Sequence, residues 1–139
     1  MRPLTRFWRD QGGGAAIEMA IVTPVIAGLA LVSAEVWMMS MDKQKAATAL
    51  EAASDYYMSG GLSDEEAVDV AMAAWSDAPQ DGEVSPVRSG RCGIEAADIS
   101  ELCADGSTAA IYVTLTAHGT SQGLFEPRGV EAERTVRVR

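Results

Sequence analysis

The strongest pattern of apolar positions lies near the N-terminal end of the chain. Residues 15–41 contain two charged side chains, Glu18 and Glu35, which flank sixteen residues without any charge. A helix needs ~20 mostly apolar residues to cross the hydrocarbon core of a bilayer, and membrane helices tolerate a proline such as Pro24. The pattern predicts a membrane-spanning helix over residues 14–41. The alternative is a buried core helix, but the remaining chain is too small to enclose one on all sides.

The helical period of apolar positions continues beyond this run, and no breaker separates the two parts. Residues 42–58 carry apolar side chains at i, i+3, i+4 and i+7 spacing. The expected inward face consists of Ala46, Ala49, Leu50, Ala53 and Tyr57. One helix from residue 15 to residue 58 would be about 65 Å long at ~1.5 Å per residue. Gly60 and Gly61 are expected to end it.

A second, shorter amphipathic helix is predicted over residues 63–76. Ser63 and Glu66 have the spacing of a capping box, and Pro79 follows the last helical position. The positions expected to face inward are Val68, Ala71, Met72 and Trp75. The carboxylates Glu65, Glu66 and Asp69 could be a metal site, but a solvated first turn of a helix explains them better.

Strand patterns are confined to residues 84–139. The clearest strand covers residues 109–117, where Ile111, Val113, Leu115 and Ala117 alternate with other side chains. Pro86 weakens a preceding strand.

Residues 118–129 are expected to form a loop, and residues 130–139 alternate again, with Thr135 out of phase. This second strand is expected to pair antiparallel with the first. The predicted fold class is therefore α+β: a long N-terminal membrane-spanning helix continues into a small head, residues 42–139, with a second helix and a short antiparallel sheet.

Two cysteines, Cys92 and Cys103, lie in the head region. In a chain exported through its own membrane helix they suggest a disulfide, which the chain-entropy model values at ~3 kcal/mol at most for so short a loop. His118 is the single histidine, so a four-ligand metal site lacks donors. A redox pair would more plausibly have CxxC spacing.

Charge narrows the classes of function. The net charge is −9, and the part from Asp42 onward alone has 8 Lys and Arg against 17 Asp and Glu, which also gives −9. Binding of nucleic acid driven by electrostatics is therefore not expected. The sequence has no phosphate-binding glycine loop, no catalytic triad motif and no HExxH. We expect neither an enzyme nor a cofactor, and we expect His118 to be a surface residue.

The segment before the apolar run, residues 1–13, is short and basic. Arg2, Arg6 and Arg9 oppose one acid, Asp10. A basic segment in front of an apolar helix holds the N-terminus in the cytoplasm, so the head would lie on the other side of the membrane. The glycines at positions 12–14 are expected to give an extended, flexible backbone that a protease could bind.

Glu18 stands at the start of the apolar run. A carboxylate within a membrane segment is costly and suggests a functional role. The alternatives are an acid that complements the dipole at the start of a helix and an interfacial charge among the lipid headgroups.

The order of these features is basic leader, glycine, small residues, glutamate and apolar helix, and it resembles the class III signal of type IV pilins. Over residues 12–55 the chain is more narrowly similar to the TadE-like family of the tight-adherence pilus, although Met19 stands where related pseudopilins often have tyrosine or phenylalanine. The resemblance implies that a membrane-embedded prepilin peptidase cuts between Gly13 and Gly14. Glu18 would then be the fifth mature residue and would pair with the new ammonium group of Gly14, across subunits.

The resemblance also implies a function. The chain would be a minor pilin or pseudopilin of a tight-adherence type IV pilus, single-pass in the bacterial inner membrane with a periplasmic head, and extracellular after assembly into or at the tip of the fibre, where it supports adhesion. Its partners would be other pilins, the prepilin peptidase, the inner-membrane assembly platform and membrane lipid, without nucleic acid. The alternative is a secreted binding module whose ordinary signal peptide is cleaved after Ala34, where Val32 and Ser33 complete a small-residue site. The position of Glu18 and the glycine triplet argue against it.

Overall fold

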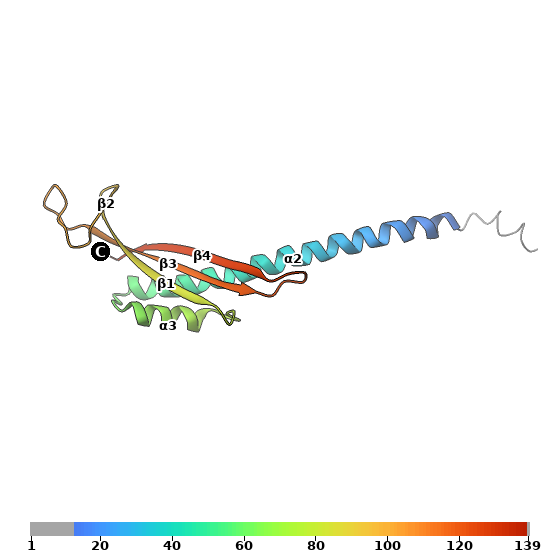
Figure 1. Ribbon diagram of the computed structural model, residues 1–139, viewed down its shortest axis with the longest axis horizontal. Helices are drawn as coiled ribbons and strands as arrows, with labels where there is room; N and C mark the ends of the chain where they lie inside the picture. The colour runs from blue at the N-terminus through green and yellow to red at the C-terminus, as the bar shows by residue number, and fades with distance from the viewer. Residues whose placement is uncertain (1–12, 139) are drawn as a thin grey trace, which may run out of the picture. The chain divides into compact units, whose positions relative to one another are not determined.

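The computed structural model describes residues 13–138 (Figure 1). The described chain divides into two compact units, one that ends at Trp37 and one that begins at Met38. The elements follow in the order α2 (Gly13–Met58), α3 (Asp64–Ala74), β1 (Glu83–Cys92), β2 (Glu95–Ala97), β3 (Ala110–Ser121) and β4 (Arg128–Arg137). The fold is α+β, as the sequence predicts. Residues 1–12 of the basic leader, with its three arginines, lie outside the described residues.

Helix α2 is 46 residues long and contains Pro24 without interruption. It begins at Gly13, so the prediction of an extended backbone is wrong for Gly13 and Gly14. Glycine in the interior of a helix costs ~1 kcal/mol relative to alanine. In the first turn the N–H groups need no partner within the helix, and the following alanines, Ala15 and Ala16, favour helix.

In the second unit, one sheet of four antiparallel strands has the order β2-β1-β3-β4. The core is formed by one cluster of buried side chains that come from α2, α3, β1, β3 and β4. Since the buried strand residues occupy alternate positions, for example Val113, Leu115 and Ala117, both helices pack on the same face of the sheet.

All five residues predicted to face inward from residues 42–58 are buried: Ala46, Ala49, Leu50, Ala53 and Tyr57. Four of them are small or medium-sized, which allows the helix to approach the sheet closely. The helix ends where the sequence predicts, because Gly60 has a φ of 99° and its N–H donates to the carbonyl of Tyr57. A Cβ atom on Gly61 would overlap the Tyr56 ring.

Helix α3 is shorter than the predicted range of residues 63–76. Ser63 is the N-cap, and its Oγ accepts a hydrogen bond from the Glu66 N–H. Ala71 and Trp75 are buried as expected, while Val68 and Met72 pack at the edge of the core. The capping-box prediction is confirmed for the Ser63 half; the Glu66 carboxylate instead accepts a hydrogen bond from the Tyr56 hydroxyl.

The predicted strand boundaries need correction. Residues 118–121 belong to β3 and residues 128–129 to β4, so the predicted loop shortens to residues 122–127. Alternation alone does not reveal this, because the pairing of His118 with Glu131 and of Thr120 with Gly129 depends on backbone hydrogen bonds between strands. Strand β1 also continues through Pro86; β2 pairs with β1 only at Gly90–Cys92, so Pro86 lies on a free edge.

The alternation of β4 is regular rather than interrupted at Thr135. Thr135 lies on the outer face of the sheet, where its hydroxyl is 3.1 Å from that of Thr114. Arg134 takes the inward position, and its Nη2 lies 3.6 Å from Oε1 of Glu51 on α2. The sequence suggested a break because a charged residue occupies an inward position near the rim of the core.

Candidate functional site

Within the part of the chain that the structure describes, α2 is the one helix long and apolar enough to cross a membrane. Its most apolar stretch has none of its residues buried inside the protein. Large exposed apolar side chains occur throughout this stretch: Ile17, Met19, Ile21, Val22, Val25, Ile26, Leu29, Leu31, Val32 and Val36. A helix that is apolar all round fits a lipid environment, so this half of α2 is suited to be a membrane anchor.

The proposed cleavage and register residues lie at the beginning of α2. Gly13 is its first residue, and Glu18 is exposed in the second turn. Gly14 and Glu18 are four residues apart, so they share one face of the helix, one turn apart. Among the described residues the Glu18 side chain has no hydrogen bond or ion pair, which leaves its carboxylate available to a partner outside this chain.

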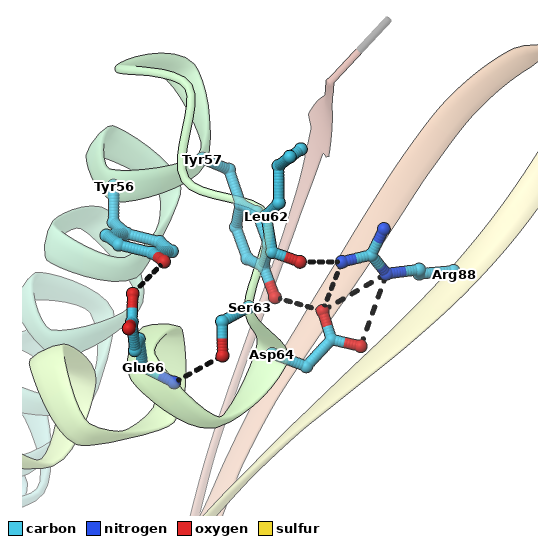
Figure 2. A network of polar contacts seen from close by, with 7 residues as sticks. All are labelled: Tyr56, Tyr57, Leu62, Ser63, Asp64, Glu66 and Arg88. Atoms are coloured by element: carbon cyan, nitrogen blue, oxygen red, sulfur yellow. Dashed lines mark hydrogen bonds and ion pairs between the residues drawn. The ribbon is translucent and has the colours of Figure 1, made fainter.

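The head contains a polar network between the end of α2, the start of α3 and strand β1 (Figure 2). The Arg88 guanidinium donates from both Nε and Nη2 to the Asp64 carboxylate, with 2.6 Å between Nη2 and Oδ1. Nη2 also donates to the Leu62 carbonyl, at 2.8 Å. The Tyr57 hydroxyl donates to Oδ1 of Asp64, at 2.7 Å. A forked pair of this kind fixes geometry as well as charge, so it fastens the α2–α3 turn to the sheet.

The network shifts the titration of its members. The hydrogen bonds from Arg88 lower the pKa of Asp64, with a further contribution from Tyr57. Burial, followed by the hydrogen bond to Asp64, raises the pKa of Tyr57 to about 12. Both shifts preserve the ionised carboxylate and the neutral phenol at neutral pH. The network therefore joins the α2–α3 turn to the sheet through a charged carboxylate and a neutral phenol.

Asp64→Asn is expected to reduce the loss of stability in acid. A carboxyl with a lowered pKa in the folded state stabilises the fold above its ordinary pKa of 3.8, and that contribution is lost as the pH falls through the folded value. Because the Arg88 and Asp64 side chains are 34% and 42% exposed, solvent screening limits the effect to ~1 kcal/mol or less. Urea unfolding of the full chain in mild detergent at pH 6 and pH 3 measures the difference.

Asp69→Asn provides the matched control, since Asp69 is an exposed carboxylate on the same helix. It should keep the acid dependence of the wild-type protein. Equal acid dependence in Asp64→Asn and wild type would contradict the role assigned to the Arg88 contact.

A second set of polar contacts joins the other end of the sheet to α2. The Ser121 hydroxyl donates to Oδ2 of Asp42, at 2.6 Å, and Nη2 of Arg128 lies 3.8 Å from the same oxygen. The Lys45 ammonium lies 2.9 Å from Oδ2 of Asp77, which follows α3. Asp42 is the first charged residue after the apolar run, so Ser121 and Arg128 bind α2 at that boundary.

Cys92 and Cys103 form a disulfide, as predicted, with their Cα atoms 5.6 Å apart. Cys92 is the last residue of β1, and the enclosed strand β2 folds back on Gly90–Cys92. The bond therefore closes the loop of residues 92–103, which contains β2, at one end of the sheet. The prediction that His118 lies on the surface is confirmed: it is exposed, within β3, and its Nε2 lies 3.5 Å from Oε2 of Glu83.

Sequence reasoning missed the residues of both polar clusters. Arg88 and Asp64 are 24 positions apart, and Ser121 and Asp42 are 79 apart. One signal was available for Arg88: it occupies an inward position of β1, in phase with the buried Val84, and a charge there requires a partner. No local pattern indicates that the partner is Asp64.

The fold and these contacts define an α+β protein with a disulfide-closed head and an N-terminal helix able to cross a membrane. Comparison with protein-family models, with curated proteins and with solved structures gave no match.

Proposed function

We propose that this protein is a minor pilin or pseudopilin of a tight-adherence type IV pilus. The observation that carries the proposal is the composition of α2. This one helix contains Gly14 and Glu18, then the exposed apolar stretch, and finally the alanine-rich face of residues 46–57 that is buried in the head. The first half of such a helix suits a membrane before assembly and the interior of a fibre after it, because both are apolar. The second half connects that anchor to a folded head.

Glu18 sets the axial register of neighbouring subunits in this proposal. Cleavage between Gly13 and Gly14 creates an ammonium group at Gly14, and an isolated carboxylate in an apolar environment is costly unless it is paired. Gly14 and Glu18 are both exposed at the start of α2, which supports an ion pair formed between subunits. A subunit out of register would leave both charges buried without partners.

The location and partners follow from this role. The basic leader keeps the N-terminus in the cytoplasm, so the head faces the periplasm of the inner membrane and becomes extracellular in the fibre. The partners are the prepilin peptidase, the inner-membrane assembly platform, lipid, and other pilins. The disulfide between Cys92 and Cys103 supports an oxidising location for the head.

The mature chain is expected to begin at Gly14. Intact-mass measurement and N-terminal sequencing of protein extracted from membranes of the producing bacterium measure this directly. Gly13→Leu should abolish processing, because a bulky side chain then replaces the glycine before the cut. Ala34→Leu should be processed like the wild-type chain, since it alters only the site that an ordinary signal peptidase would use.

A mature N-terminus at Glu35 would contradict the proposal and identify the protein as a secreted binding module.

A further inference from the structure

The loop between β3 and β4, residues 122–127, carries two large apolar side chains at its tip. Leu124 is 52% exposed and Phe125 is 65% exposed. Single exposed apolar residues are ordinary on protein surfaces, but this pair is adjacent and lies on a short hairpin loop with a defined place in the head (Figure 1).

That place is the end of the head where α2 enters it. Strand β3 runs antiparallel to α2, because Ile111 near its start lines a hollow of about 300 Å³ together with Tyr57, and Ser121 at its end hydrogen-bonds to Asp42. The chain then continues beyond Asp42 towards the Met38 end of the helix. At ~3.3 Å per residue, the three residues after Ser121 can carry the tip up to ~10 Å past Asp42.

The same level of α2 is rich in side chains suited to a membrane interface. Met38, Met39 and Met41 precede Asp42, and the exposed Lys43 follows it. Apolar and aromatic side chains favour the boundary between acyl chains and headgroups, while basic side chains meet anionic headgroups. A hairpin tip with leucine and phenylalanine at this level fits the same environment.

We infer that the 122–127 loop inserts Leu124 and Phe125 into the bilayer surface beside α2. The inference rests on the part of the proposed function that places α2 across the membrane. Glu126 follows Phe125 and keeps its charge near the headgroups, so insertion is shallow. The loop then gives the unassembled subunit a second contact with lipid, which restricts rotation and tilt of the head on the membrane.

The test uses the full chain in phosphatidylcholine and phosphatidylglycerol vesicles that contain lipids brominated at defined acyl positions. The chain has three tryptophans. Trp8→Phe and Trp37→Phe remove two of them, so that only the buried Trp75 remains and contributes the same emission to every variant. Phe125→Trp is the test position. Its emission should be quenched most by bromines near the headgroup end of the acyl chain, because interfacial side chains lie ~5–10 Å into that boundary.

Two further tryptophans in the same background serve as controls. Leu29→Trp lies in the exposed apolar stretch and should be quenched by bromines deep in the bilayer. Ile94→Trp lies in the disulfide-closed loop, at the Tyr57 end of the sheet; Ile94 is 97% exposed and the tryptophan should keep its full emission. Comparison of Phe125→Trp with Ile94→Trp therefore separates insertion at the tip from general exposure of apolar residues.

The outcomes are distinguishable. If Leu29→Trp is quenched and Phe125→Trp is not, the inference fails while membrane anchoring stands. If neither is quenched, both fail. If the emission of Phe125→Trp responds to added partner pilin but not to bromolipid, the tip binds protein rather than lipid, and the inference is overturned.

Discussion

Glu18→Ala is expected to leave membrane insertion and processing intact and to prevent efficient assembly into fibres. Insertion should survive, because an acidic residue costs ~2.5–3.5 kcal/mol on translocon scales at the centre of a membrane helix and less near its end, where Glu18 lies, and its removal makes the segment more apolar. Processing should survive, because Gly13 and Gly14 are unchanged. Assembly should fail, because the Gly14 ammonium is left in the apolar fibre interior without its partner.

Breaking a buried pair in this way typically costs ~3–5 kcal/mol, which corresponds to a loss on the order of 100-fold or more in an assembly equilibrium. The measurement compares processed protein in the membrane with protein recovered in sheared surface fibres. Glu18→Gln separates the causes: an effect close to that of alanine indicates charge pairing, and a mild effect indicates hydrogen bonding.

Met19→Leu is the positional control for this experiment. It keeps an apolar side chain of similar size at the adjacent position without changing the charge, and it should assemble much like the wild type. Normal incorporation of Glu18→Ala would mean that Glu18 only complements the dipole at the start of α2.

Leu50→Ala is expected to destabilise the head by ~2–5 kcal/mol. Leu50 is 1% exposed and is the one leucine in the buried face of α2. The substitution removes apolar contact with the core and leaves a cavity that the surrounding alanines are too short to fill. In urea unfolding of the full chain in mild detergent, the midpoint should fall while the dependence on denaturant stays constant.

Leu62→Ala is the matched control, since it makes the same chemical change at a side chain that is 81% exposed. It should change the stability by ~0.5 kcal/mol or less. The emission of Trp75, in the Trp8→Phe and Trp37→Phe background, reports unfolding of the head in both variants. Equal losses in the two variants would contradict the packing of α2 against the sheet.

The sequence alone determined the elements whose signal is local. The uncharged run between Glu18 and Glu35 and the alanine face of residues 42–58 predicted α2 and its buried positions, because a helix repeats every 3.6 residues and its apolar stripe is visible in the chain. The N-cap at Ser63, the turn at Gly60 and the central part of β3 were also predicted from local signals: a capping side chain, a glycine and a two-residue alternation.

The tertiary structure decided what depends on contacts between different segments of the chain. The ends of β3 and β4, the course of β1 through Pro86 and the inward position of Arg134 follow from strand pairing, which places residues such as Thr120 and Gly129 opposite each other. The partner of Arg88 and the grip of Ser121 on Asp42 arise in the same way. Each of these contacts joins two segments of the chain: β3 and β4 across the loop of residues 122–127, and Arg88 and Ser121 to partners 24 and 79 positions away. No pattern within a single segment specifies which residues meet.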